Sequence, residues 1–161
     1  MKTKLFYLML AVFCLSLAAC SKDEDNEPES DEFLVGTWEP THIKGSIHYK
    51  WENTDTTWVF DKDIKAGEHI EFKHESGALS MTLSSAEFLA DHTCTIDGKK
   101  QDGYTWSYKK GTVTMIYQKG QEKEERSLKV KNSTTLVSSL DGEGGDKGIY
   151  EKYDVTFTKK K

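Results

Sequence analysis

From residue 33 onward, β-branched and aromatic residues alternate with polar ones, and short turn signals interrupt the alternation. A period of two is typical of strands that bury one face and expose the other. Tyr104, Trp106 and Tyr108, for example, share one face, and the residues between them are Thr and Ser. The runs are separated by turn signals at Asp97-Gly98, Lys110-Gly111, Lys119-Gly120 and Asn132-Ser133. The sequence therefore predicts an all-β chain.

The pattern predicts a long first strand over residues 38–49, followed by an irregular loop over residues 50–67 that includes Trp51, Trp58 and Phe60. Further strands are expected at residues 68–74, 79–89, 93–96, 103–108, 112–118, 122–130, 134–140 and 149–158. His92 is expected in a left-handed backbone conformation in the turn at residues 90–93. About eight or nine antiparallel strands then follow one another as an up-and-down meander. We expect this meander to close into a barrel, because closure removes exposed strand edges.

The N-terminus has the features of a secretory signal peptide. It begins with a basic stretch, continues with an apolar run over residues 5–19, and reaches Leu17-Ala18-Ala19-Cys20. Cleavage before a cysteine resembles the lipobox of bacterial lipoproteins, in which Cys20 would carry the acyl chains that anchor the protein. The alternative is an ordinary cleaved signal with Cys20 incidental to it.

We therefore divide the chain into a signal peptide (residues 1–19), a lipidated Cys20 with a disordered acidic tether (residues 20–32) and a β-barrel domain (residues 33–161). The run Ser21-Lys22-Asp23-Glu24-Asp25 resembles the export signal of Bacteroidota lipoproteins. That resemblance implies an outer-membrane lipoprotein exposed at the cell surface, although the same run also suits a solvated spacer.

The composition argues against several classes of partner. The net charge is −5 before the basic signal peptide is removed, so neither nucleic acid nor an anionic membrane surface is an expected partner. The apolar fraction is 36%, and the signal peptide holds a large share of it, so the domain core is modest. Cys94 is the one cysteine of the domain, which excludes an internal disulfide; we expect a half-buried strand cysteine.

Short motifs resemble those of lipocalins. Gly36-Thr37-Trp38 resembles their Gly-x-Trp opening, and residues 33–161 as a whole are similar to the small lipocalin-like lipoproteins of Bacteroidota. The shared features are a turn at residues 88–93, a Gly-x-Trp-Ser-Tyr strand, which at residues 103–108 is one residue longer, and an aromatic last strand at residues 153–159. The resemblance implies a barrel with an internal ligand; it does not specify an activity.

Arg126 is the only arginine of the chain and shares a strand face with Leu128 and Val130. If that face is inward, Arg126 is a candidate to bind a ligand carboxylate through two parallel hydrogen bonds. The lipocalin resemblance suggests a second role, in which Arg126 stacks on Trp38 and closes the barrel floor. The third reading is a surface charge within the run Glu122-Lys123-Glu124-Glu125-Arg126.

Six residues are the candidate ligand-binding set: Trp51, Trp58, Phe60, Trp106, Tyr117 and Arg126. Loops form lids at the open end of a barrel, which favours Trp51, Trp58 and Phe60 as ligand contacts. The alternative is that these three aromatic side chains plug the barrel mouth and complete a small core. The predicted cavity lining comprises Tyr104, Trp106, Met115, Tyr117, Leu128, Leu136, Val155 and Phe157.

The five histidines show no metal-ligand spacing, and no nucleophile motif or phosphate-binding loop is present. We therefore expect neither a metal nor a cofactor, and no enzymatic activity. The sequence favours a monomeric, membrane-anchored protein that binds a small apolar or amphipathic molecule. The rival hypothesis is a surface interaction module with a filled barrel, which binds a protein or a glycan.

Overall fold

The computed structural model describes residues 30–74, 77–143 and 148–161. The predicted signal peptide, Cys20 and most of the predicted tether lie outside these residues, as does part of the glycine-rich segment after Asp141. In the described part of the chain, no helix is both long and apolar enough to cross a membrane.

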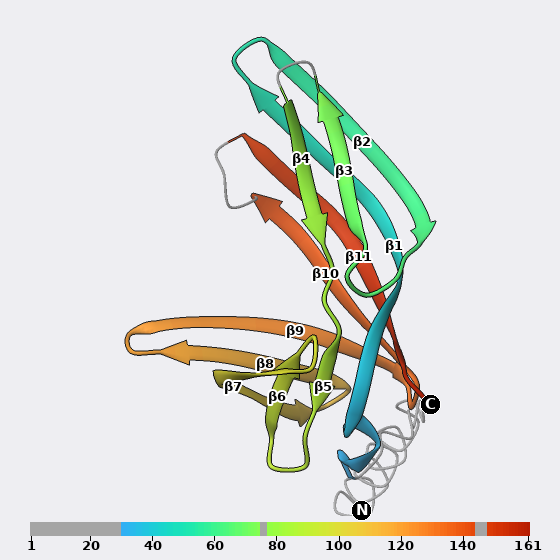
Figure 1. Ribbon diagram of the computed structural model, residues 1–161, viewed down its shortest axis with the longest axis vertical. Coiled ribbons are helices and arrows are strands. Elements are labelled where there is room, and N and C mark those ends of the chain that lie inside the picture. The colour runs from blue at the N-terminus through green and yellow to red at the C-terminus, as the bar shows by residue number, and fades with distance from the viewer. Residues whose placement is uncertain (1–29, 75–76, 144–147) are drawn as a thin grey trace, which may run out of the picture.

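A short 3-10 helix (Glu32–Leu34) precedes the strands, which make up most of the described chain. The strands are β1 (Gly36–Trp51), β2 (Thr54–Asp63), β3 (His69–His74), β4 (Gly77–Thr82), β5 (Ala86–Phe88), β6 (Thr93–Ile96), β7 (Lys99–Lys109), β8 (Thr112–Lys119), β9 (Glu122–Asn132), β10 (Thr135–Glu143) and β11 (Ile149–Lys159). Figure 1 shows the long strands β1, β2, β10 and β11 in the upper part of the view and β5 to β9 below them.

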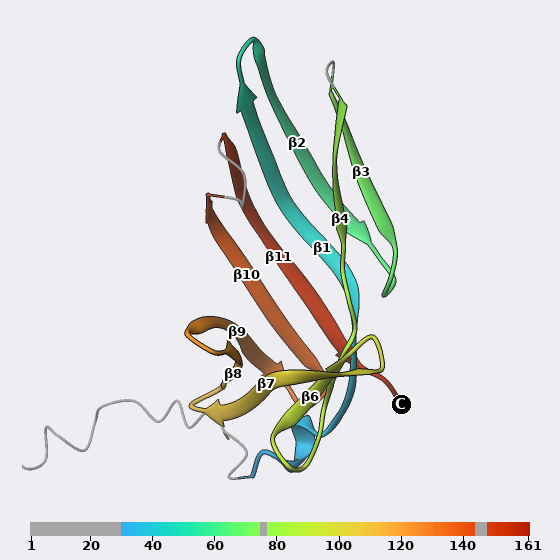
Figure 2. The same cartoon turned by 60° about the vertical axis from the view of Figure 1, so that its left-hand side comes forward.

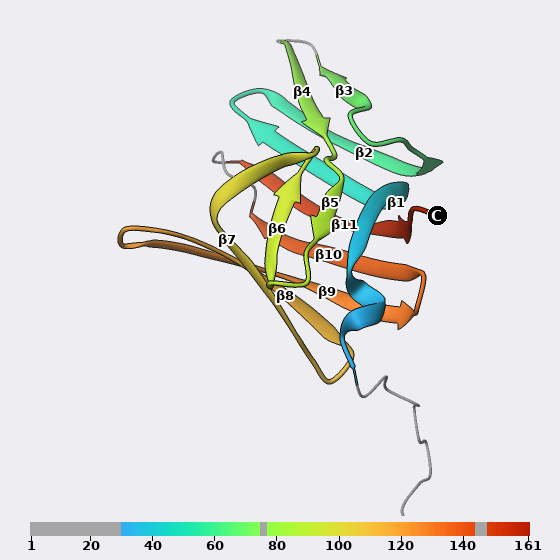
Figure 3. The ribbon, with the colours of Figure 1, turned by 60° about the horizontal axis from the view of Figure 1, so that its bottom comes forward.

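Eight of these strands form a closed antiparallel ring. The sheet order runs from β11 back through β10, β9, β8, β7, β6 and β5 to β1, and β1 pairs with β11 as well, which closes the ring (Figure 3). The closing ladder is long, since it extends from Trp38 opposite Lys159 to Tyr49 opposite Ile149. The prediction of an all-β, up-and-down meander closed into a lipocalin-like barrel is confirmed.

The remaining three strands extend one side of the ring. β2 pairs with the second half of β1, from His42 opposite Asp63 to Trp51 opposite Thr54, while β3 and β4 pair only with each other. Figure 2 shows the β3–β4 hairpin beside the β1–β2 hairpin. The expected irregular loop at residues 50–67 is therefore wrong. Burial does alternate along β2, but its polar side chains lie on both faces and conceal the period.

The expected strand over residues 79–89 is also divided in two. β4 ends at Thr82 and β5 begins at Ala86, because the chain passes there from the outer hairpin into the ring. The predicted turns are present. Asp97 and Gly98 have φ values of 50° and 71°, as a tight hairpin turn requires, and His92 has a φ of 63°. The predictions for Asp97-Gly98 and His92 are thus confirmed.

Two apolar clusters stabilise the fold. The ring cluster lies inside the closed barrel and includes Trp38 and Phe88, both essentially inaccessible. The Trp38 indole N–H also donates a hydrogen bond to the Leu34 carbonyl oxygen, at 2.8 Å. The hairpin cluster lies between β1, β11 and the outer strands, and its buried members are Ile43, Ile47, Ile64, Ile70, Phe72 and Val155.

Gly45 lies on the inward side of β1, between Phe60 of β2 and Tyr153 of β11. The rings of Phe60 and Tyr153 are 6.1 Å apart at their centroids and meet across this glycine. Gly45 has a φ of 153°, and a Cβ atom there would lie 2.2 Å from the Lys152 carbonyl oxygen. Only glycine fits at this crossing of three strands.

Replacing Gly45 should destabilise the whole fold. We expect Gly45→Ala to lower the free energy of unfolding by roughly 2–4 kcal/mol, since the Cβ overlaps backbone atoms and the φ is unfavourable. Urea unfolding followed by tryptophan fluorescence measures this. Gly142→Ala is the matched control, because a Cβ there meets no atom within 4 Å. Equal stability of the two variants would contradict the assignment of Gly45 as a packing constraint.

Candidate functional site

The ring contains a region where two neighbouring strands separate. β9 and β10 pair only from Asn132 opposite Thr135 to Leu128 opposite Ser138. Beyond that point β9 stays with β8 as far as Glu122, and β10 stays with β11 as far as Glu143. Figure 1 shows the two strand pairs diverging. We call the space between them the β9–β10 cleft.

Two adjoining cavities occupy the β9–β10 cleft and the interior behind it. The larger has a volume of about 460 Å³ and the smaller about 280 Å³. Both are lined by Leu83, Arg126, Ser138 and Phe157. The larger cavity adds Glu124, Glu125, Ser127, Ser139, Leu140, Tyr153 and Val155, and the smaller adds Thr82, Ser84, Ala86, Ile96, Tyr104, Met115 and Leu128. The smaller cavity is therefore mainly apolar, whereas the larger carries the charged groups.

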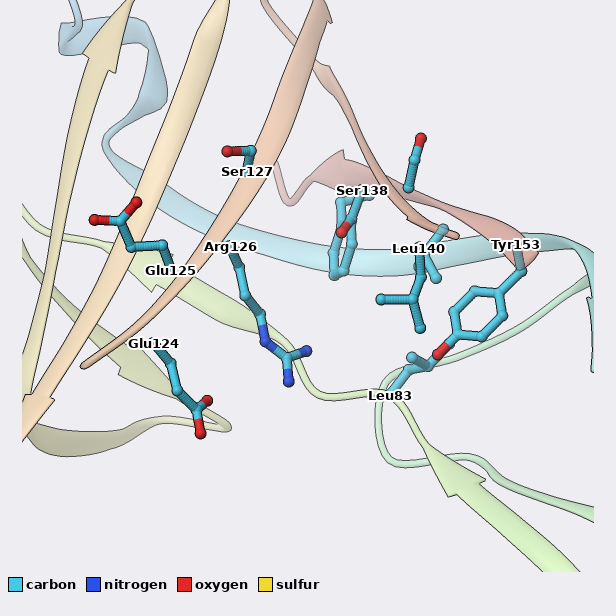
Figure 4. A pocket seen from close by; sticks show the side chains of 11 residues that line it. Leu83, Glu124, Glu125, Arg126, Ser127, Ser138, Leu140 and Tyr153 are labelled. Atoms are coloured by element: carbon cyan, nitrogen blue, oxygen red, sulfur yellow. The ribbon is translucent and has the colours of Figure 1, made fainter. Parts of the chain in front are cut away.

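Arg126 lies at the junction of the two cavities. It pairs with Met115 of β8, and it shares its strand face with the buried Leu128, so its side chain is on the inner side of β9. Figure 4 shows the guanidinium pointing into the space between β9 and the side chains of Leu83 and Tyr153. Among the described residues, no carboxylate oxygen lies within 4 Å of this guanidinium. Its charge is solvent-accessible and has no ion-pair partner within the described ranges.

Ionisable groups on β9 and β11 surround this cation. Burial raises the pKa of Glu151 and that of the Tyr153 phenol, while the positive charge of Arg126 acts in the opposite direction on both. Glu125 forms an ion pair with Lys123 at 2.6 Å. Glu124 lines the larger cavity and has no such pair among the described residues. The cleft thus combines one cation with nearby carboxylates, of which Glu125 is ion-paired to Lys123, and with a protonated phenol.

The alternative in which Arg126 stacks on Trp38 is wrong, because another cation occupies that place. The Nζ atom of Lys159 lies 5.8 Å from the centre of the Trp38 ring system. The register explains this, since Lys159 is the partner of Trp38 across the β1–β11 ladder. The same Lys159 ammonium donates a hydrogen bond to the Phe33 carbonyl oxygen. Arg126 is left available to the cleft.

Three predicted ligand contacts lie away from the cleft. Trp51 is 50% exposed at the end of β1. Trp58 and Phe60 project from β2 onto the outer hairpin, where their rings lie 5.7 Å and 5.5 Å from that of Phe72. Trp58 and Phe60 therefore complete the hairpin cluster, and neither they nor Trp51 line the two cavities. The alternative in which aromatics fill a small core describes Trp58 and Phe60 best.

The other predicted contacts divide between core and cavity. Trp106 is buried and stacks on His92, with ring centroids 4.7 Å apart, so it is inaccessible to a ligand. Tyr117 contacts the ring of Tyr104 but lines neither cavity. Of the predicted cavity lining, Tyr104, Met115, Leu128, Val155 and Phe157 are confirmed, whereas Trp106 and Leu136 line neither cavity.

Residues that line the larger cavity but are absent from the predicted lining include Leu83, Ser138, Leu140 and Tyr153. Alternation along β10 and β11 offers a signal for three of them. It places Leu140 and Tyr153 on inner faces without indicating a cavity, and Ser138 has the same parity as Leu140. Leu83 follows β4 in the connection to β5, and only the three-dimensional path of that connection brings it to the cleft.

Two other candidate groups lack the geometry for chemistry. Cys94 is fully buried rather than half-buried, and burial raises the pKa of its thiol, which disfavours a reactive thiolate. No group of three or more His, Cys, Asp or Glu side chains in the described ranges is arranged to hold a metal ion.

A polar cluster lies on the outer side of the β1–β2 hairpin. The two imidazole nitrogens of His42 lie 2.9 Å from Asp63 Oδ1 and 2.9 Å from Asp61 Oδ1. Lys44 approaches the other oxygen of Asp61, at 2.7 Å. Hydrogen bonding to Asp63, and then to Asp61, raises the pKa of His42. Pairing with Lys44, followed by His42, lowers the pKa of Asp61.

Comparison with models of protein families, with curated proteins and with solved structures finds no match to this chain.

The His42 cluster should make stability depend on pH. His42 has a folded pKa above its ordinary value of 6.5, so its contribution is complete below about pH 6.5 and is lost as the pH rises through the folded value. Asp61 has a folded pKa below 3.8, so its contribution is lost only as the pH falls through that lower value. His42→Gln should therefore lower the melting temperature at about pH 5.5 more than at about pH 8.5.

His69→Gln is the control, because the His69 imidazole contacts the Thr82 hydroxyl and, within the described chain, no carboxylate. Differential scanning fluorimetry at the two pH values measures the effect. A pH-independent loss on His42→Gln, equal to that of the control, would contradict the prediction.

Proposed function

We propose that this protein is a membrane-anchored lipocalin-like lipoprotein that binds a small amphipathic molecule in the β9–β10 cleft, without catalysing a reaction. The observation that carries the proposal is the arrangement of the two cavities. A mainly apolar cavity adjoins a more polar one, and an inward-pointing cation without an ion-pair partner among the described residues stands at their junction. Pockets with apolar walls and a few convergent polar groups are typical of small-molecule sites.

The cleft has walls of suitable chemistry for an apolar body. Leu128, Met115 and Phe157 from three different strands line the smaller cavity. Covering about 200 Å² of apolar ligand surface contributes about 5 kcal/mol. The loss of translational and rotational freedom offsets much of that gain. A ligand of this size therefore needs at least one polar interaction in addition to burial, and the cavity junction supplies a group for it.

The residues of the cleft favour binding over catalysis. Neither cavity is lined by a histidine, cysteine or lysine of the described chain. The lining serines, Ser127, Ser138 and Ser139 among them, have no imidazole beside them in these linings to accept a proton. A serine without a base is a weak nucleophile, so these hydroxyl groups are suited to hydrogen bonding with a ligand.

The membrane anchor is proposed from the sequence. Leu17-Ala18-Ala19-Cys20 supports lipidation of Cys20, and the acidic residues that follow support export to the outer face of the outer membrane. Under this proposal the barrel is held close to the cell surface, where amphipathic molecules concentrate.

A second function is favoured by a separate observation. Val59 is 82% exposed on β2, and Trp51 is 50% exposed on the same β1–β2 hairpin. A large exposed aromatic side chain such as that of Trp51 is typical of the residues that anchor protein interfaces. Under this alternative the β1–β2 hairpin, rather than the cleft, contacts a partner.

Native mass spectrometry distinguishes the two functions. The barrel and both clusters lie after residue 30, so residues 21–161 contain the whole described fold and are incubated with a bacterial extract of lipids and metabolites. We expect a discrete mass adduct. Ser138→Phe should reduce the adduct about tenfold or more, because Ser138 lines both cavities and the larger phenylalanine side chain fills them.

Val137→Phe is the matched control, since Val137 is the adjacent residue on the outer side of β10. It should retain the adduct, and both variants should melt close to the parent. An apo mass across all extracts would contradict ligand binding and favour the interaction module. An adduct that Ser138→Phe leaves unchanged would place the ligand outside the cleft.

A further inference from the structure

Arg126 is the starting point for inferring the chemical class of the ligand. Charged side chains on a strand usually point to solvent, but that of Arg126 lies on the inner face, in register with Met115. The nearby acids do not neutralise it: Glu125 is paired with Lys123, and no described carboxylate reaches Arg126 within 4 Å. A guanidinium offers several donors in a planar fork that matches a carboxylate.

Hydrogen-bond donors converge on the same space. Ser138 lines both cavities, and Tyr153 lines the larger one, with its hydroxyl directed toward Leu83 (Figure 4). Burial raises the pKa of Tyr153, so its phenol stays protonated at neutral pH and donates. An anionic acceptor bound at Arg126 thus has neutral donors available beside the cation.

The smaller cavity is the more apolar of the two spaces that adjoin Arg126. From Arg126 the smaller cavity continues between Met115, Leu128 and Phe157 toward Tyr104 and Ile96. A molecule with its head group at Arg126 therefore places its body in this cavity. The position of Arg126 at the junction of the two cavities therefore sets the orientation of the ligand.

We infer that the ligand is an amphipathic monocarboxylate, with its carboxylate bound by Arg126 and its apolar chain in the smaller cavity. This inference rests on the proposed function, because it presupposes that the cleft binds a small molecule. It goes beyond that function by fixing the sign, the number of charges and the orientation of the ligand.

The acidic neighbours favour a single negative charge. Glu124 and Glu125 line the larger cavity with Arg126, and Glu151 faces inward on β11, two residues from Tyr153. One cation among three acids is sufficient for a carboxylate, whereas a doubly charged phosphate monoester meets stronger repulsion. The Glu151 carboxylate interacts with the positive charge of Arg126, which acts to lower the pKa of Glu151. It therefore competes with the carboxylate of the ligand for that charge. Removing the charge of Glu151 should therefore tighten carboxylate binding.

The test compares probes that differ only in their head groups. Dodecanoate, dodecanol, dodecylamine and dodecyl phosphate are titrated into residues 21–161 at neutral pH, below their aggregation limits, with binding followed by native mass spectrometry and calorimetry. We expect dodecanoate to bind about tenfold or more tightly than each of the other three. Arg126→Gln should remove this preference, and Arg126→Lys should keep only part of it, because an ammonium lacks the planar fork.

Lys129→Gln is the matched control for charge. Lys129 is exposed on the same strand but has the opposite parity, so it lies on the outer side of the ring. Lys129→Gln should retain the preference for dodecanoate, and Glu151→Gln should tighten dodecanoate about twofold or more without changing dodecanol. The melting temperature of each variant confirms that it is folded.

The possible outcomes test the inference and the proposed function separately. No binding of any probe, together with no adduct from extracts, overturns the proposed function. Binding of dodecanol or dodecylamine as tight as that of dodecanoate overturns the inference but leaves a ligand-binding cleft. Tighter binding of dodecyl phosphate overturns the assignment of a carboxylate. Loss of preference in Lys129→Gln to the same degree as in Arg126→Gln also overturns it, because the charge effect is then not local.

Discussion

The long antiparallel ladder between β1 and β11 is the interaction on which the rest of the structure depends. It spans from Trp38 opposite Lys159 to Tyr49 opposite Ile149. It therefore belongs to both halves of the molecule, the closed ring and the part that carries the outer strands. Its first part closes the ring around Trp38, and its second part supports the hairpin cluster through Ile43, Ile47 and Val155. Gly45 lets β1 and its two neighbours approach closely where the halves meet.

The cleft is a consequence of this shared ladder. β10 pairs with β11 along its whole length, into the part that carries the outer strands, whereas β9 pairs with β8 around the ring. Because β8 and β11 diverge, β9 and β10 separate with them. The β9–β10 ladder therefore ends at Ser138. Inward side chains beyond this point, Arg126 and Leu140 among them, face a space instead of a neighbouring strand. The site is thus a gap in strand pairing, enclosed by the strands on either side.

The sequence predicts the ring well and the site only in part. Local signals specify the turns at Asp97 and His92 and the inner face of each strand, because turn geometry and alternation are local properties. The assignment of Lys159, rather than Arg126, to Trp38 depends on pairing between the two ends of the chain, which no local pattern contains. The sequence does not predict β2, because Thr54 and Thr56 lie on its inner face, where an apolar residue is the usual signal of a strand.

Part of the core is separate from the cleft, and this has a consequence for how the site can vary. Trp38, Phe88 and Cys94 are fully buried in the ring cluster and do not line the cavities, whereas Arg126 and Leu140 line the cleft and are exposed. Substitution of exposed side chains changes stability little, but substitution of the ring cluster leaves cavities that cost several kcal/mol. Head-group specificity at Arg126 is therefore free to change while the fold is retained. The same barrel can bind different ligands through exchange of a few cleft residues.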